Sequence, residues 1–172
     1  MKKIMIIGSG GSGKSTLARQ LGLVLQIPVV HLDKLWWKPG WVSVSCEEFD
    51  VLHRSAIEEP TWIIDGNFSR TIPQRLEKCD AVIYLDFNRV TCLMSVLKRV
   101  LTNLGKVRPD MGEGCPERIS WEFLGWVWNF NKNNRKKTYD LLFRATHAQV
   151  YIFRNRKEVR KFLADIRREY GV

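Results

Sequence analysis

The N-terminal part of the sequence contains a glycine-rich segment whose residue types suit phosphate binding. Residues 8–15, GSGGSGKS, fit the pattern G-x-x-x-x-G-K-[ST], and they follow an apolar run and precede a predicted helix. Glycines allow a tight turn in which several backbone N–H groups point at one phosphate, and the positive end of the helix dipole adds to that attraction. Lys14 would reach the terminal phosphate oxygens, and the Ser15 hydroxyl would coordinate Mg²⁺. We therefore expect nucleotide contacts from Gly8, Ser9, Gly10, Gly11, Ser12, Gly13, Lys14, Ser15 and Thr16.

Asp65 is a second candidate for the metal site because it ends another apolar run, Trp62–Ile64. P-loop enzymes commonly hold the magnesium ion with a carboxylate at the end of a strand. The dipeptide Asp65-Gly66 is also a turn signal, so an acid that only caps a turn is the alternative. Given Lys14 and Ser15, we favour a metal-binding role for Asp65, together with Ser15.

Asp33 is the candidate for a group that acts on the phosphoryl acceptor. It ends a predicted strand at residues 28–33 and should face the same sheet edge as the phosphate-binding loop. An ionised phosphate acceptor needs no base, whereas a hydroxyl acceptor benefits from a carboxylate that takes its proton. Asp33 therefore indicates an alcohol. The alternative is a polar strand-end residue that pairs with Lys34 or Lys38.

Three tryptophans, Trp36, Trp37 and Trp41, surround Pro39-Gly40 in a segment that we predict to be a loop. Side chains of this size are costly to leave in water, so they must pack against something. We favour a small satellite core beneath an acceptor-binding segment at about residues 34–60. The alternative is that the tryptophans stack on a nucleobase. Trp36 is the tryptophan that we assign to substrate binding.

Arginines that could stabilise the migrating phosphoryl group occur around a stretch rich in glycine and proline. Arg99 lies near the end of a predicted helix at 90–101, and Arg108 lies within residues 103–118, which we call the lid segment. In phosphoryl transfer, closure of such a segment brings cations onto the transferred group and excludes water. Arg99, Arg108 and Arg135 are candidates in that order, and for each the alternative is an exposed charge.

The elements that must position these residues alternate between strands and helices. A strand followed by a helix and then by another strand is typical of a mainly parallel sheet covered by helices on both faces. At 172 residues, we expect one domain that spans residues 1–172. The predicted strands are 3–7, 28–33, 61–64, 81–85 and 150–153, and the predicted helices are 15–26, 45–59, 90–101, 117–143 and 157–169.

Composition narrows the classes of protein further. No apolar stretch reaches the length that spans a bilayer, and no secretory leader is apparent, so we expect a cytoplasmic location. Four cysteines lack the spacing of zinc or redox pairs, which predicts ordinary reduced thiols.

Charge is distributed unevenly along the chain. Of the net charge of +10, +8 falls in residues 132–172, where twelve Lys/Arg face four Asp/Glu. A negative partner is therefore expected near the C-terminal part. Nucleotide phosphates, nucleic acid and an acidic membrane surface all qualify, and charge alone does not choose among them.

The possible classes of P-loop protein are limited by what the sequence lacks. A GTPase needs Asn-Lys-x-Asp after a strand, and the one candidate, residues 131–134, lacks the Asp and lies in a predicted helix. Remodelling and transporter ATPases need longer chains for additional modules. A small kinase that uses ATP and Mg²⁺ remains.

Several stretches resemble known kinase-related proteins. Residues 65–74, DGNFSRTIPQ, look like the Asp-Gly-Phe-Pro-Arg-Thr-Ile-Pro-Gln stretch of adenylate kinases, with one residue inserted and the proline missing. Residues 31–41 and 108–117 resemble the bacterial topology-modulation (FlaR-like) proteins, which are adenylate-kinase-related P-loop proteins. The resemblance implies ATP binding and a nucleoside-monophosphate-kinase-like, five-stranded parallel sheet of order 2-3-1-4-5. By motif, it also implies that Arg70 contacts the phosphate of an acceptor.

The function that these patterns favour is transfer of the ATP γ-phosphoryl group to a small acceptor: a nucleotide, a nucleoside or another small alcohol. The alternative is a nucleic-acid-binding regulatory ATPase that affects DNA topology, which the basic C-terminal part and the resemblance suggest. No recognition-helix, zinc-finger or aromatic RNA-binding pattern is present, so nucleic acid is the less favoured partner. We expect no membrane association and a monomer or weak homo-oligomer.

Overall fold

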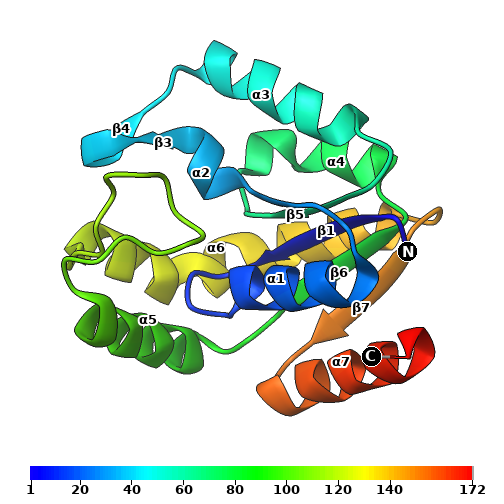
Figure 1. Cartoon of the computed structure of the whole chain (residues 1–172). Coiled ribbons are helices and arrows are strands. Elements are labelled where there is room, and N and C mark those ends of the chain that lie inside the picture. The colour runs from blue at the N-terminus through cyan, green and yellow to red at the C-terminus, as the bar shows by residue number, and fades with distance from the viewer. Residues whose placement is uncertain (172) are drawn as a thin grey trace.

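A parallel sheet of five strands forms the centre of the computed structural model, which describes residues 1–171 (Figure 1). The strands lie in the order β2-β5-β1-β6-β7. Numbered along the chain among themselves, these five strands have the order 2-3-1-4-5, so the predicted order is confirmed. Their bounds are β1 Lys3–Gly8, β2 Val29–His31, β5 Trp62–Asp65, β6 Ala81–Leu85 and β7 Gln149–Phe153.

Seven α-helices and a small hairpin complete the described chain. Two short 3-10 helices occupy Pro39–Trp41 and Ser69–Thr71, and β3 (Trp37–Lys38) pairs antiparallel with β4 (Val42–Ser43). The helices are α1 Lys14–Leu25, α2 Leu32–Trp36, α3 Cys46–Glu58, α4 Ile72–Lys78, α5 Arg89–Asn103, α6 Trp121–Arg144 and α7 Arg156–Tyr170.

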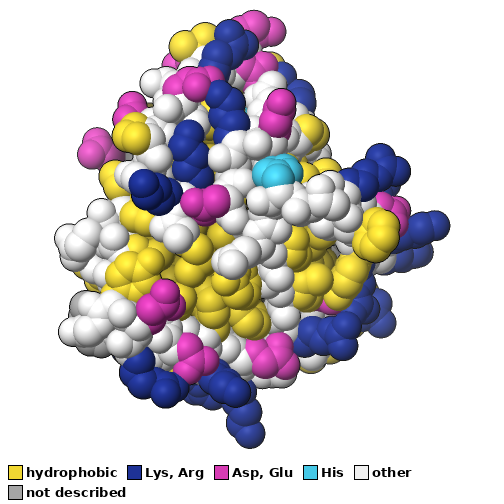
Figure 2. Space-filling view, turned by 90° about the vertical axis from the view of Figure 1, so that its right-hand side faces the viewer, with side chains coloured by type: hydrophobic (Ala, Val, Ile, Leu, Met, Phe, Trp, Pro, Cys, Tyr) yellow, Lys and Arg dark blue, Asp and Glu magenta, His cyan; other side chains and the backbone are white. Residues whose placement is uncertain are grey.

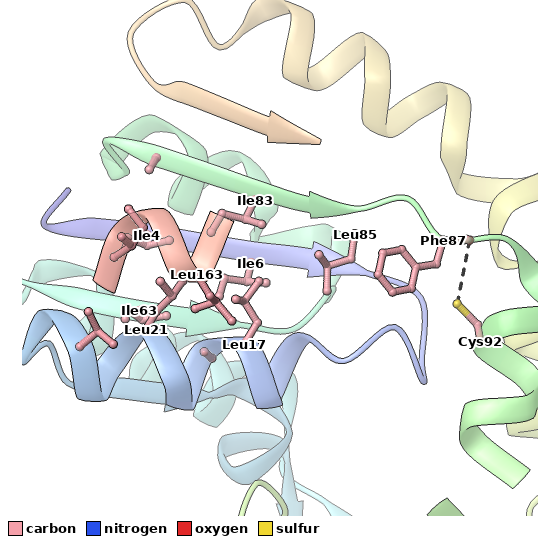
Figure 3. Packing of buried hydrophobic residues seen from close by; sticks show 14 of the residues in the cluster. Ile4, Ile6, Leu17, Leu21, Ile63, Ile83, Leu85, Phe87, Cys92 and Leu163 are labelled. Atoms are coloured by element: carbon pink, nitrogen blue, oxygen red, sulfur yellow. Dashed lines mark hydrogen bonds between the residues drawn. The ribbon is translucent and has the colours of Figure 1, made fainter. Parts of the chain in front are cut away.

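The sheet buries apolar side chains on both faces because successive residues of a strand point in opposite directions. Figure 3 shows the packing on the face covered by α1 and α7. Each such fully buried side chain contributes roughly 1.5–3 kcal/mol of transfer free energy. Buried on this face are Ile4 and Ile6 of β1, Ile63, Ile83, Leu17 and Leu21 of α1, and Leu163 of α7. The other face packs Met5, Ile7, Ile64 and Val82 against α3, α4 and the C-terminal half of α6.

Strand register brings the chemically interesting residues to one edge of the sheet. Ile6 of β1 lies opposite Asp65 of β5, and Gly8 lies opposite Leu85 of β6. The carboxyl ends of these strands are therefore level, and the segments that follow them meet there. In open parallel sheets this edge is where ligands bind.

The second strand is shorter than predicted. β2 ends at His31, which lies opposite Asp65, and its partner β5 ends at that residue. Residues beyond His31 have no ladder partner, and the chain turns into α2 instead. Asp33 therefore lies in the first turn of a short helix rather than at a strand end. The segment predicted as a loop around the tryptophans likewise contains α2 and the β3–β4 hairpin, which we call the 37–43 hairpin.

Side-chain caps mark the starts of α3 and α6. Ser45 caps α3 as predicted, because its hydroxyl accepts a hydrogen bond from the Glu48 N–H at 3.1 Å. The long helix predicted from residue 117 begins at Trp121 instead, since the Ser120 hydroxyl accepts from the Phe123 N–H at 3.2 Å and caps it there. The preceding residues belong to the lid segment.

The lid segment is folded onto the 37–43 hairpin. The Gly40 N–H donates to the Gly114 carbonyl at 2.9 Å, and the Trp41 indole donates to the Pro116 carbonyl at 3.1 Å. Gly112 approaches the hairpin so closely that an added Cβ would lie 2.2 Å from the Trp37 carbonyl oxygen. Two segments far apart in the sequence thus form one continuous wall.

The C-terminal helix exposes several basic side chains. Figure 2 shows lysine and arginine side chains along the lower margin of the molecule, at the level of α7, and apolar side chains at the level of the sheet. α7 buries Leu163 and Ile166 and exposes Arg160, Lys161, Arg167 and Arg168. Within residues 1–171, no helix combines the length and the apolar character needed to cross a membrane.

Candidate active site

The glycine-rich loop between β1 and α1 has the conformation that its sequence predicts. Gly11 has a φ of +77° and lies so close to α5 that a Cβ would be 2.3 Å from the Cys92 carbonyl oxygen. Gly13, with a φ of +95°, has open space around its Cα and precedes the first turn of α1. Glycine is thus required at one position for close approach and at the other for backbone conformation.

Lys14 extends over this loop, where its ammonium group donates a hydrogen bond to the Ser9 carbonyl at 2.9 Å. Burial lowers the pKa of Lys14, and the nearby Asp65 and Asp33 oppose that shift. The ammonium group has further N–H donors. Together with the backbone N–H groups of the loop, they suit the oxygens of a bound phosphate. The loop and Lys14 therefore fit the phosphates of a nucleoside triphosphate.

Ser15 and Asp65 lie side by side, as expected for a shared metal site. The Ser15 hydroxyl donates to Asp65 Oδ2 at 2.7 Å, and the other carboxylate oxygen, Oδ1, contacts Nδ1 of the buried His31. Mg²⁺ prefers oxygen ligands and is usually held by one or two carboxylates together with substrate phosphates. A hydroxyl and a carboxylate next to the phosphate loop fit that ion.

A cavity of about 960 Å³ opens from the phosphate loop. It is lined by Gly11, Lys14 and Ser15 on one side and by the tryptophans of α2 and the 37–43 hairpin on another. This volume is at the upper end of the range for small-molecule sites, about 300–1,000 Å³, so it has room for more than triphosphate oxygens.

Asp33 lines this cavity together with Lys14. Burial raises the pKa of Asp33, Lys14 opposes the shift, and Asp65 adds to it. A carboxylate whose pKa is raised is a better proton acceptor than one in water. The structure thus brings the predicted acceptor-side acid and the phosphate-side lysine to one cavity, although Asp33 reaches it from a helix.

The two leading arginine candidates also line the cavity, and both are paired with acids of the lid segment. Arg99 donates to Glu117 Oε1 at 3.0 Å, and Arg108 contacts Glu117 Oε2 at 2.7 Å through Nε. Arg108 also donates to Asp110 Oδ2 at 2.6 Å. Asp110 and Glu117 were not predicted as site residues, since acids in a segment without periodicity give no signal of what they face.

Two other arginines lie outside the cavity wall. Arg70 pairs with Asp50 of α3 at 2.8 Å and is exposed, so the structure does not bring the residue matched by the adenylate-kinase motif to the cavity. Arg135 makes two hydrogen bonds to Asp86 Oδ2, at 3.0 and 2.8 Å, and fastens α6 to the end of β6.

Trp36 packs in a small core, and it also borders the cavity. Its ring packs against Phe49 and Phe68, with centroids 5.2 and 5.7 Å away, in a small aromatic cluster. It also lines the cavity, together with Trp37 and Trp41.

The fold of this chain is similar to folds already known from solved structures. No family model and no curated protein matches the sequence. Among solved structures, the chain is similar to shikimate kinase from Bacteroides thetaiotaomicron, with a TM-score of 0.54 and 16% identity, covering 98% of each chain. It is also similar to shikimate kinase from Acinetobacter baumannii in complex with shikimate, with a TM-score of 0.55 and 17% identity, covering 96% of this chain and 90% of that one. The fold is that of the nucleoside-monophosphate-kinase-like P-loop kinases.

Within this P-loop kinase fold, two residues without a sequence signal hold the site together. Arg75, fully buried, donates to the carbonyls of Gly66 and Asn67 at 2.9 and 2.7 Å, directly after Asp65. The Asn67 amide exchanges two hydrogen bonds with the backbone of Gly8, at 3.1 and 2.7 Å. The end of β5 is thereby tied to the start of the phosphate loop. A buried arginine that serves backbone carbonyls is rare, so nothing in its spacing distinguished Arg75 from an exposed one.

Proposed function

We propose that this chain is an ATP- and Mg²⁺-dependent kinase that phosphorylates a hydroxyl group of a small molecule. The observation that carries the proposal is the single cavity that contains Lys14 of the phosphate loop and the Asp33 carboxyl, with the Ser15–Asp65 pair at its phosphate-loop side. ATP bound with Mg²⁺ would supply the phosphoryl group and shield its charge.

Different residues of the chain would perform the other steps of the reaction. The loop N–H groups and Lys14 would bind the phosphates, and Ser15 and Asp65 would hold the metal ion. Asp33 would accept the proton of the acceptor hydroxyl on its carboxylate. Arg99 and Arg108 would stabilise charge on the migrating group, and residues 103–118 would act as the lid that excludes water. Since these arginines are already paired with lid acids, lid position and charge stabilisation would be coupled.

Two further observations support a hydroxyl acceptor. The arginine that would grip an acceptor phosphate, Arg70, is paired outside the cavity. The solved structures of similar fold are kinases, and one of them holds shikimate. We retain kinship with the topology-modulation proteins as a proposal that agrees with this fold.

The test is acceptor-dependent formation of ADP and of a labelled product from γ-labelled ATP, across a panel of small alcohols, nucleosides and nucleotides. Lys14→Ala should lower the rate of transfer by about 10²- to 10³-fold while the protein stays folded, because one preorganised charge contact is lost. The matched control is Lys98→Ala, an exposed lysine of α5 outside the cavity wall. Undiminished transfer by Lys14→Ala would contradict the proposal.

A nucleic-acid-binding ATPase is the second candidate, because four exposed basic residues lie on the solvent side of α7. Such a face can contact a phosphate backbone without a recognition motif. The kinase is favoured because the cavity offers a reaction site, whereas the basic face offers charge alone.

A further inference from the structure

Flat and apolar side chains make up part of the cavity lining. We call this part the acceptor end and define it by Asp33 and the apolar residues around it. Tryptophan and phenylalanine rings present large rigid surfaces that favour stacking on another flat group. The apolar residues of the acceptor end are Trp36, Trp37, Trp41, Phe68 and Met111.

Three polar side chains of the cavity wall, Asn67, Arg99 and Arg108, make hydrogen bonds or ion pairs inside the protein, although Arg99 Nε has no hydrogen-bond partner. Asn67 uses its amide oxygen and nitrogen on the backbone of Gly8. Arg108 is shared between Asp110 and Glu117, and Arg99 is bound to Glu117. Both acids are buried, with 7% and 5% of their surfaces exposed. An anionic acceptor that drew Arg108 away would leave the buried Asp110 carboxylate without its ion-pair partner, which is strongly unfavourable.

Arg118 lines the cavity without an ion pair to a described carboxylate, as do Arg19 and Arg156. The guanidinium of Arg118 lies 5.1 Å from the centre of the Trp41 ring, and its side chain is exposed at the rim of the cavity. A charge contact in that position is screened by water and weak. Arg118 thus supports the Trp41 ring from outside and gives little reason to expect an acceptor anion.

Resting on the kinase function proposed above, we propose that the acceptor is an uncharged alcohol with a flat aromatic or similarly apolar ring. A nucleoside or an aromatic alcohol belongs to this class, and a phosphate- or carboxylate-bearing compound does not. The ring would stack among the tryptophans and place its hydroxyl at Asp33. The hydroxyl oxygen would form a bond to the γ-phosphorus as the bond to ADP breaks, and the hydroxyl proton would pass to the Asp33 carboxylate.

The first experiment compares matched pairs of compounds, each an uncharged alcohol and its anionic counterpart, such as a nucleoside and its 5′-monophosphate. Acceptor-dependent ADP formation gives kcat/KM, and calorimetry without ATP gives the Kd of each compound. The uncharged member should be preferred at least tenfold in both measurements. The proposal would be overturned if the anionic member had the higher kcat/KM and the lower Kd. It would also be overturned if no compound were phosphorylated and the anionic member bound more tightly.

The second experiment uses two variants of the acceptor end. Trp37→Leu should raise the Kd and KM of the uncharged acceptor about tenfold and leave the Kd of ATP unchanged, because stacking surface is lost while the indole hydrogen bond of Trp41 to the lid segment stays in place. The control is Trp128→Leu, a half-exposed tryptophan of α6 outside the cavity wall. Arg118→Gln should change the acceptor Kd less than threefold, and a tenfold loss would show that an anion is bound there and would overturn the proposal.

These readouts separate the two proposals. If uncharged ring compounds bind at the acceptor end but no compound is phosphorylated in a Lys14-dependent way, the kinase function fails and the acceptor class stands. If Lys14-dependent transfer occurs to anionic compounds with a loss in Arg118→Gln, the kinase function stands and the acceptor class fails.

Discussion

Asp33 is the side chain on which the choice of acceptor depends. If it takes the proton of a hydroxyl, Asp33→Asn should lower kcat by about 10²- to 10⁴-fold and leave the Kd of ATP nearly unchanged. Because burial raises the pKa of Asp33, kcat should fall as the pH drops through that raised value, above the ordinary range of an aspartate. Stopped assays over a pH series would measure both effects. Asp140→Asn, an exposed acid of α6, is the control, and equal rates for Asp33→Asn and the native protein would contradict the role.

His53 should make the stability of the protein depend on pH. It is completely buried in α3, and burial, followed by Arg75, lowers its pKa to about 4, while Asp50 opposes the shift. Between pH 6.5 and 4 the unfolded chain binds a proton that the folded chain does not, so stability should fall as the pH falls through this window. The loss should be at most about 3 kcal/mol.

Urea unfolding at several pH values, for the native protein and His53→Leu, would measure this contribution. The variant should lack part of the decrease in unfolding free energy between pH 6.5 and 4. Identical slopes in the two proteins would contradict the assignment. The comparison is a difference between two proteins, so other acids that titrate in the same range cancel.

At the scale of elements, the contact between the lid segment and the 37–43 hairpin depends on the absence of a side chain at Gly112. Gly112→Ala would place a methyl group 2.2 Å from the Trp37 carbonyl oxygen, so the two segments must separate. We expect about a tenfold loss of kcat/KM for the acceptor and faster proteolysis within residues 103–118, with little change in the Kd of ATP. The control is Gly125→Ala on α6, where an added Cβ meets open space. Unchanged proteolysis of Gly112→Ala would show that the contact does not hold the lid.

The strands were predictable at this scale because each is a short apolar run between helical periods, and parallel pairing leaves few arrangements. Their order came from the resemblance to small kinases and is confirmed. The phosphate loop was predictable because local backbone conformation requires its glycines. The position of Asp33 was not, because β2 stops where its partner strand stops, which only the register reveals. Nor was the partner of Arg70, since an ion pair across twenty residues leaves no trace in spacing.

At the scale of the whole molecule, α7 carries six Lys and Arg residues against three acids, and its basic side chains are exposed. If this face offers charge alone, DNA binding should be weak, without sequence preference, and largely abolished between about 50 and 200 mM salt, because it arises from counterion release. Titration of labelled duplexes with the native protein and with Arg160, Lys161, Arg167 and Arg168 replaced together by Gln would test this. Tight, salt-resistant binding that changes when ATP is added would favour the regulatory ATPase instead.

The hydrogen bonds between the lid segment and the hairpin have a consequence for the time course of a reaction. Because Gly40 and Trp41 are hydrogen-bonded to Gly114 and Pro116, the hairpin and the lid segment form one piece, which under the proposed function would cover both substrates. Both products would then have to wait for the same opening event before either could leave. If that opening is slower than phosphoryl transfer, quenching the first turnover after mixing would reveal a burst of phosphorylated product, still bound and equal to the number of sites, followed by a slower steady rate.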